Sequence, residues 1–429
     1  MKKHLLLILF LICLMAYSGY AQEVATDAPK DKLTVDLMIR PRTEFRNGAF
    51  TLRDKDDDPA YFISQRSRVT LGYTSGKIKI GLGFQNVAVW GQVGQVTNNS
   101  GSTTMINEAW AEYLFTPEFS LKVGRQALSY DDQRILGGLD WHQAGRWHDL
   151  ALFKYEKGET KLHAGLAYSQ DGENRLGNFY SSPGNNYKSM QMLRFENALG
   201  EAYKLSVLAL NTAFQVGSDS SMVSMQTLGA NIVKTKGAFT FTGSAYYQTG
   251  ENTAKRDVGA WMAAIYGKYQ LTEKFAVNAG TDFLSGQDMN AAGNDFNAFN
   301  PLYGTHHKFY GLMDYFYVGS AHGNVGLWDK YLGVSAAVAP KFNLALNIHN
   351  FSSAGVIFAN GEEQSKGLGT EADLTFTWGL AKNAKLVGGY SQMFASDSME
   401  VIKGGGDSSL GQNWLWAMLI INPRIFESK

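Results

Sequence analysis

Apolar and polar residues alternate strictly in many short stretches between residues 33 and 421. In one of them, Ile78, Ile80 and Leu82 alternate with Lys77 and Lys79. A period of two predicts β-strands with one apolar and one polar face. Sixteen stretches pair across tight turns as eight hairpins and one more lies at each end, so 18 strands are expected. They are residues 33–45, 63–73, 77–89, 109–115, 119–128, 149–156, 160–170, 192–198, 202–214, 226–233, 238–248, 259–269, 275–284, 325–338, 342–350, 368–378, 386–393 and 413–421.

The connections between these strands alternate in length. Turns within hairpins are tight, as at residues 74–76, whereas most connections between hairpins are long, as at residues 129–145 and 286–324. Short periplasmic turns and long extracellular loops are typical of a transmembrane β-barrel. A soluble β-sandwich would show the same alternation without this asymmetry, and a propeller would show a blade repeat that is not found here. The pattern therefore predicts an all-β, 18-stranded antiparallel transmembrane β-barrel.

The N-terminus indicates secretion. Lys2 and Lys3 precede an apolar stretch at residues 5–15, and a small-residue cleavage site ends at Ala21, which is the pattern of a signal peptide. Ile12 is too large for the usual lipoprotein signal before a cysteine, so cleavage is expected to remove Cys13. We expect a signal peptide at 1–21, a short periplasmic segment at 22–32 and the barrel at 33–429.

Composition supports this class of protein. The 429 residues include 46 Gly and 13% aromatic residues, but only 18% are charged, and the net charge is zero. A neutral chain lacks the basic excess of a nucleic-acid binder. After residue 21 no stretch of 18 consecutive apolar residues could form a spanning helix. A barrel of this many strands encloses a lumen too wide for its wall side chains alone to fill, so a channel is expected.

Arginines concentrate on the polar faces of the first two expected strands. Arg40, Arg42 and Arg46 lie on one strand, and Arg66 and Arg68 lie on the next. One hypothesis is a basic wall of the pore that favours anionic solutes. The alternative is an arginine–carboxylate ladder that only stiffens the barrel. Its expected carboxylate partners are Glu44, Glu108 and Glu112.

Several motifs resemble the alginate export family of outer-membrane barrels. They are the runs at residues 107–113, 121–126, 132–137 and 146–149, together with the opening runs at residues 40–44 and 65–69. The resemblance implies an 18-stranded channel with an arginine-rich constriction that passes an acidic polysaccharide. It implies lumen or constriction positions for Arg40, Arg42, Arg66, Arg68, Glu108, Arg125, Arg134, Arg146 and Asp149. Simple alternation places Arg125 with Leu121 and Val123 on the apolar face, so a lumen position requires a bulge near Gly124.

Two loops could carry other chemistry. Asp54, Asp56, Asp57 and Asp58 crowd one loop, but their spacing lacks the EF-hand pattern, so a solvated acidic loop is favoured over a Ca²⁺ site. A metal site at His306 and His307 would need a further ligand of fixed spacing. A loop that folds into the lumen explains the same region better, because it also carries the aromatic residues Tyr310, Tyr315, Phe316 and Tyr317.

The sequence favours a passive channel over an enzyme. It contains no Gly-x-Ser-x-Gly motif, and the nearness of His142 and His148 to Ser129 is thin support for a Ser–His pair. We therefore predict no catalytic residue, no metal and no cofactor. The leading hypothesis is passage or export of an anionic saccharide, the alternative is a general diffusion porin, and an outer-membrane enzyme is third. Expected partners are the solute, outer-membrane lipid and the barrel assembly machinery during insertion, and no nucleic acid is expected.

Overall fold

The computed structural model describes residues 31–93, 103–181, 186–217, 221–305, 307–316 and 322–428. The expected signal peptide, most of the segment at residues 22–32, and the loop residues His306 and Tyr317 lie outside these ranges. Within the described residues no helix is long and apolar enough to cross a membrane.

Eighteen long strands form one closed antiparallel barrel, as the sequence predicts. They are β1 (Lys32–Asn47), β2 (Ala60–Ser75), β3 (Ile78–Val89), β4 (Thr104–Leu114), β5 (Phe119–Gln126), β6 (His148–Lys157), β7 (Thr160–Tyr168), β8 (Ser189–Leu199), β9 (Tyr203–Gln215), β10 (Met222–Lys236), β11 (Phe239–Glu251), β12 (Asp257–Gln270), β13 (Phe275–Leu284), β15 (Leu327–Ala339), β16 (Phe342–Ser352), β19 (Gly367–Ala381), β20 (Ala384–Ala395) and β21 (Gln412–Ile421). Every expected strand overlaps one of these.

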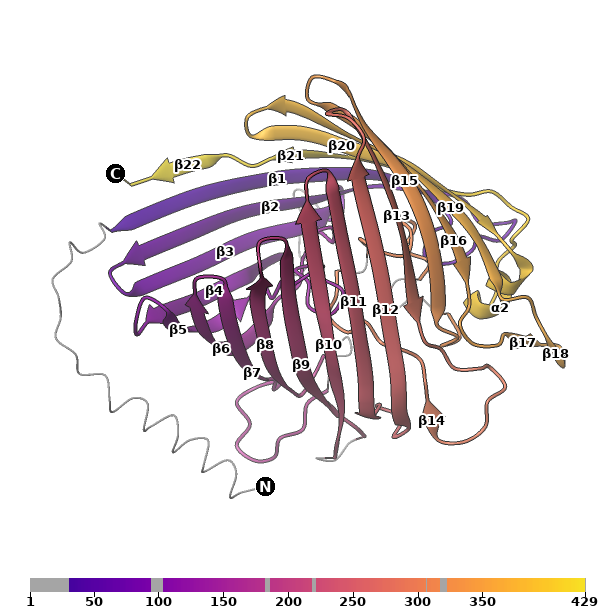
Figure 1. Ribbon diagram of the computed structural model, residues 1–429, viewed down its shortest axis with the longest axis horizontal. Coiled ribbons are helices and arrows are strands. Elements are labelled where there is room, and N and C mark those ends of the chain that lie inside the picture. The colour runs from indigo at the N-terminus through magenta and orange to yellow at the C-terminus, as the bar shows by residue number, and fades with distance from the viewer. Residues whose placement is uncertain are drawn as a thin grey trace.

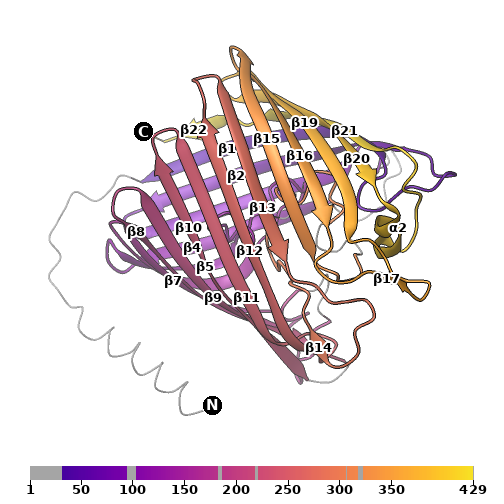
Figure 2. The same cartoon turned by 45° about the vertical axis from the view of Figure 1, so that its right-hand side comes forward.

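The barrel closes between its first and last strands. β21 pairs with β1, where Arg46 lies opposite Trp414, and the short strand β22 (Arg424–Glu427) continues the pairing beyond it. The additional short elements are β14 (Asp295–Phe296), the β17–β18 hairpin (Phe358–Ala359 and Glu362–Glu363) and helix α2 (Asp397–Lys403). They gather at the end that carries the long connections, which we call the long-loop end, and the tight turns lie at the other end, the turn end (Figure 1). The same arrangement is visible after rotation (Figure 2).

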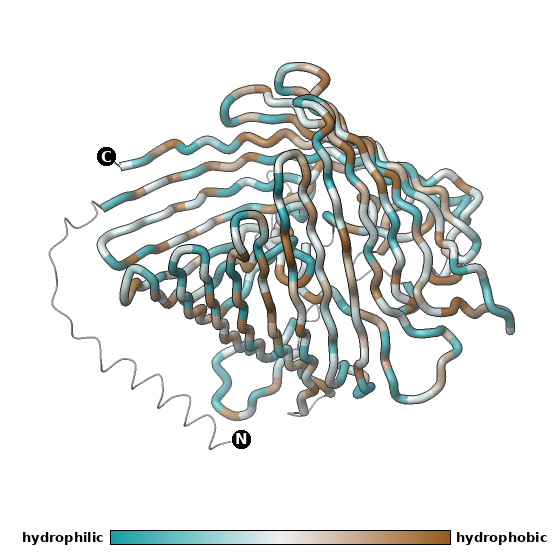
Figure 3. The backbone as a smooth tube through the Cα atoms, viewed as in Figure 1, coloured by the Kyte–Doolittle hydropathy of each residue, from teal (hydrophilic) through white to brown (hydrophobic). Residues whose placement is uncertain are grey.

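The outer face is apolar and carries aromatic residues at both ends. Hydropathy alternates along each strand (Figure 3), and side chains such as Val123, Leu166 and Leu332 are exposed on the outside. Exposed aromatics at the long-loop end are Tyr61, Trp90, Tyr247, Trp261, Trp328 and Phe394. Those at the turn end are Tyr113, Phe119, Tyr155, Tyr203, Phe239, Tyr269, Phe275 and Trp378. An apolar band between two aromatic girdles is the arrangement of a barrel in a bilayer.

The inner face is apolar too where the long loops cover it. Its buried apolar residues are Leu150, Leu152, Met190, Met192, Leu208, Leu210, Met225, Val258, Met262 and Leu284. They form one core cluster with Leu128, Ile135 and Leu136 of the β5–β6 loop and with Phe299 and Leu302 after β14. The lumen is therefore partly filled by packed loops and not only by water.

Candidate functional site

Four arginines on β1 and β2 form what we call the basic wall: Arg40, Arg42, Arg66 and Arg68. Arg40 lies directly opposite Arg66 across the two strands, and like charges in such a pair repel each other. Arg40, Arg42 and Arg66 are only 2%, 5% and 0% exposed. This placement therefore needs counter-charges and acceptors from elsewhere in the lumen.

The β5–β6 loop, residues 127–147, supplies them. The Asp140 carboxylate binds Arg66 at 2.6 Å and Arg40 at 3.1 Å. Main-chain carbonyls of the same loop accept further bonds, at 2.8 Å from Arg42 to Trp141, and at 2.6 Å from Arg66 to His142. The three buried arginines of the basic wall are thus covered by this loop.

The ladder hypothesis is correct at one of its three carboxylates. Glu44 accepts from Arg42 and Arg46, at 2.8 Å each. Glu108 accepts instead from the Trp110 ring nitrogen, and Glu112 binds Lys154 at 3.0 Å. Arg68 donates to Gln85 at 2.6 and 3.0 Å.

Titration in the β5–β6 loop reflects the field of this wall. Desolvation raises the pKa of Asp140, but Arg40 and Arg66 outweigh it, so that the pKa lies below its usual value. The pKa of His142 is lowered by burial and by nearby arginines, chiefly Arg42 and Arg66. An acid made stronger and a histidine kept neutral are the signs of a positive local potential.

An opposite group, the acidic wall, lies on β13, β15 and β19. Its members are Asp282, Asp329, Glu371 and Asp373, all nearly inaccessible to solvent. Asp282 lies directly opposite Asp329. His349 on β16 is placed between the acids, with its Nδ1 atom 2.9 Å from Asp329 and its Nε2 atom 3.9 Å from Asp373.

Arg134 ties the β5–β6 loop to this acidic wall. Its guanidinium binds both carboxylate oxygens of Asp282, at 2.7 and 2.9 Å, and the neighbouring Asp132 at 2.7 Å. Burial alone would lower the pKa of Arg134, but these carboxylates raise it well above the usual value. Asp131 of the same loop binds Arg194 on β8 at 2.6 Å. One loop therefore carries an acid to the basic wall and a base to the acidic wall.

A second inner segment, residues 297–305 and 307–316, packs against the first. Tyr303 exchanges main-chain hydrogen bonds with the β5–β6 loop, to Ile135 at 3.0 Å and from Gly137 at 2.9 Å. The rings of His307 and Trp141 stack at 4.0 Å between centroids. Tyr310, Tyr315 and Phe316 are buried. The predicted inward-folding aromatic loop is thus present among the described residues.

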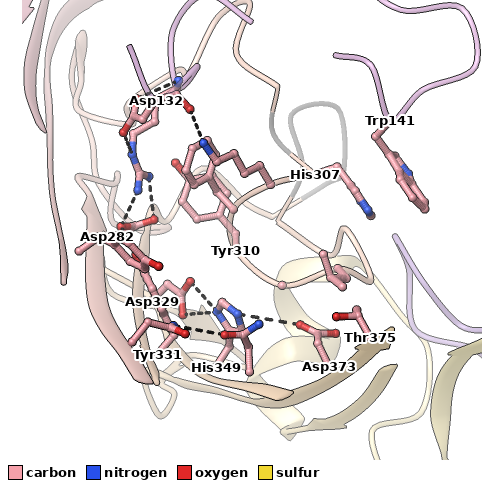
Figure 4. Close-up of a pocket in the computed structure, with 18 of the residues that line it drawn as sticks. Asp132, Trp141, Asp282, His307, Tyr310, Asp329, Tyr331, His349, Asp373 and Thr375 are labelled. Carbon is pink, nitrogen blue, oxygen red and sulfur yellow. Dashed lines mark hydrogen bonds and ion pairs between the residues drawn. The ribbon is translucent and has the colours of Figure 1, made fainter. Parts of the chain in front are cut away.

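Between the inner segments and the β11–β21 side of the barrel lies a central cavity of about 770 Å³. It is lined by acids, histidines and rings together (Figure 4), among them Asp282, Asp329, Asp373, His307, His349, Tyr310, Tyr331 and Trp141. Arg134 and Lys308 add positive charge, and Thr375, Asn278 and Asn347 add neutral polar groups. In such a lining, the aromatic rings can pack against the faces of sugar rings and the polar groups can bind the sugar hydroxyls.

The predicted lumen positions of Arg125 and Asp149 are wrong. Their carboxylate–guanidinium pair, at 2.8 and 2.9 Å, lies on the outer face, because Arg125 alternates with the buried Gln126 and shares its side with Val123. The pairings of β5 with both neighbours continue through Gly124 without a register shift. No bulge therefore turns Arg125 inward.

Arg146, a further predicted position, lies in the β5–β6 loop. Arg146 donates to the Gly304 carbonyl at 2.5 Å, so it joins the two inner segments. Asp140, Asp282 and Asp329 were not singled out from the sequence, although each lies on a polar face or beside Trp141. Within the described residues no group of three or more His, Cys, Asp or Glu side chains could hold a metal.

Comparison with known proteins agrees with this architecture. The alginate export family model matches residues 31–405, and no curated protein is detectably similar to the chain. Acinetobacter baumannii OccAB1 is 13% identical, with 92% of this chain and 97% of that one covered and a TM-score of 0.62. OccD1 (OprD) is 12% identical, with 94% and 98% covered and a TM-score of 0.63. Pseudomonas aeruginosa OpdK, solved with vanillate, is 10% identical, with 93% and 99% covered and a TM-score of 0.60.

At such identities the structural similarity concerns the fold, whereas the family match spans most of the sequence. These relatives are transport channels and not enzymes. The chain belongs to the alginate export family and is an outer-membrane β-barrel channel with an Occ-like fold.

Proposed function

We propose that the protein is a passive channel for an acidic saccharide. The observation that carries this proposal is the family match over residues 31–405, in a barrel whose inner loops leave a cavity lined by rings and polar groups. A polymer or oligomer of sugars presents apolar ring faces and hydroxyls alternately, and the cavity offers partners for both.

The preference for negative charge rests on the basic wall as a fixed field. In the described part of the chain, Glu44 and Asp140 form ion pairs with this group of five arginines, the basic wall with Arg46. These two pairs leave a formal excess of three positive charges. Charges that are shielded from water act over longer distances than exposed ones. The wall can therefore attract an anion without touching it.

A general diffusion porin is the second candidate, and the acidic wall favours it. Asp329 and Asp373 line the cavity itself, whereas the basic wall is covered by the β5–β6 loop. Buried acids that border the path oppose entry of a polyanion through their field. The two candidates therefore differ in which wall dominates the selectivity.

Ion selectivity decides between them. Purified protein in a planar bilayer under a KCl gradient should give a reversal potential of an anion-selective pore. Tri-galacturonate should block the current at a lower concentration than maltotriose, which is a neutral trisaccharide of the same length. A non-selective or cation-selective pore, blocked equally by both, would favour the general porin.

A further inference from the structure

A second cavity, of about 340 Å³, lies at the long-loop end, away from the central cavity. We call it the rim pocket. Its wall combines the outward-facing pair Arg125 and Asp149 with inner residues such as Tyr303. It is lined by Arg125, Arg146, Trp147, His148, Asp149, Tyr168, Ser169, Gln170, Tyr180, Asn186, Tyr187 and Tyr303. The pocket thus spans the rim of the barrel, from the inner segments to the outer face.

Two polar atoms in this wall are buried without a hydrogen-bond partner. They are the Nε2 atom of His148 and the hydroxyl of Tyr303, and both side chains are more than nine-tenths buried. The other ring nitrogen of His148 lies 3.0 Å from the Tyr187 hydroxyl, which fixes the ring. A buried polar group without a partner costs about 1–3 kcal/mol, so a ligand that supplies these bonds would recover that cost.

The rest of the pocket combines rings with positive charge. Trp147, Tyr168 and Tyr180 add aromatic surface, and the Lys188 ammonium lies 4.5 Å from the centre of the Tyr168 ring. Two arginines against one aspartate give the lining a formal charge of +1. Guanidinium groups bind carboxylates and phosphates, and rings pack against sugar faces.

We propose that the rim pocket binds an acidic pyranose, a sugar ring that carries a carboxylate or a phosphate. Tyr303 and His148 bind its hydroxyls, the rings pack on its faces, and Arg146 attracts its anionic group. Such a sugar can come from a soluble acidic glycan or from the headgroup of an outer-leaflet glycolipid. The outer-face position of Arg125 and Tyr168 makes the second source reachable. The proposal does not require that the same sugar crosses the channel.

The decisive variant is Tyr303→Phe, which removes one unpartnered hydroxyl and keeps the ring. Because that hydroxyl bonds nothing in the described structure and its burial carries a cost, Tyr303→Phe should fold with a stability at least equal to that of the wild type. Arg146→Gln removes the charge. Tyr331→Phe is the comparison variant, since it deletes a hydroxyl of the central cavity and therefore reports binding there. Calorimetry on full-length protein in detergent measures affinity for tri-galacturonate and for maltotriose, and native mass spectrometry measures retention of diphosphorylated lipid A.

We expect Tyr303→Phe to weaken binding about 3- to 10-fold, as loss of one hydrogen bond does. Arg146→Gln should lower the affinity for the acidic probes more than the affinity for maltotriose. Tri-galacturonate binding that responds to Tyr303→Phe assigns the soluble glycan. Lipid A retention that responds, without trisaccharide binding, assigns the glycolipid. The proposal would be overturned if neither probe binds. It would also be overturned if binding responds only to Tyr331→Phe. A channel without anion preference would contradict the proposed function and leave this result unaffected.

Discussion

The basic and acidic walls solve the same problem in different ways. Both place like charges next to each other on neighbouring strands, as Arg40 beside Arg66 and Asp282 beside Asp329. The basic wall is paired with two carboxylates, Asp140 and Glu44, and its remaining charge is solvated by loop carbonyls. The acidic wall has one buried guanidinium and one histidine, and it borders the cavity. The covered basic wall therefore acts on a solute through its electric field, whereas the acidic wall lies next to the cavity that a solute would occupy.

The largest effect should follow from cutting the tie to the acidic wall. Arg134→Gln leaves Asp282 buried without its guanidinium, which should cost about 3–5 kcal/mol and detach the β5–β6 loop. Single-channel conductance should rise severalfold and urea unfolding should shift to lower concentration. Arg175→Gln, in an exposed part of a long loop, is the control. If adding Asp282→Asn to Arg134→Gln restores no stability, the pair is not the tether.

Cutting the tie to the basic wall should have a smaller effect. Asp140→Asn keeps the loop carbonyls that bind Arg42 and Arg66 but removes the carboxylate, so we expect a loss of about 1–2 kcal/mol. Anion selectivity should increase, because the wall loses one negative charge. Asp56→Asn, an exposed acid outside the barrel wall, serves as the control. A reversal potential equal to that of the wild type would show that this wall does not reach the ion path.

The pH dependence of stability should report the burial of Lys403 of α2, which contacts the inner segment beside the acidic wall. It donates to the Tyr315 carbonyl, and burial lowers its pKa to about 7 from 10.5. The unfolded chain then holds more protons between these values, so stability should rise with pH from about 7 to 10.5, by about 5 kcal/mol at most. Urea unfolding of Lys403→Met should show a flatter pH dependence over this window, unlike that of Lys382→Met in a tight turn. Equal slopes in all three proteins would refute the buried cation.

Single charge removals should shift selectivity in opposite directions. Arg68→Gln should move the reversal potential toward cations by a few millivolts and Asp329→Asn should move it toward anions, because lumen substitutions tune selectivity. The Asp329→Asn shift should be larger, since Asp329 lines the cavity. Shifts of the same sign, or an Arg68 effect that exceeds the Asp329 effect, would reverse the contrast drawn between the walls.

The last test concerns the orientation of the barrel in the membrane, and its two cysteine substitutions should not change stability. Cysteines at Gly158 in a tight turn and at Asp57 in a long loop should differ in labelling of intact cells, and only Asp57→Cys should react with an impermeant maleimide. The only native cysteine, Cys13, lies in the expected signal peptide. Labelling of Gly158→Cys from outside would invert the barrel and place the rim pocket in the periplasm.

The strands follow from the alternation of apolar and polar residues, because lipid on one side and a polar lumen on the other impose a period of two. This pattern was least accurate at strand ends near the loops: β10 begins at Met222 and not at residue 226, since inner residues there, such as Met225, pack against loops and lose their polar character.

Tertiary structure alone decided what those inner residues meet. Periodicity assigns Arg66 to the lumen but cannot show that Asp140, 74 positions later, covers it. The Arg134–Asp282 contact spans 148 positions, and no local pattern encodes it. Arg125 is the opposite case, because local pattern was sufficient there. Alternation correctly placed Arg125 on the outer face, whereas the motif resemblance placed it in the lumen. Strand faces follow from local chemistry, whereas the inner surface of the channel depends on loops whose partners are fixed only when the barrel closes.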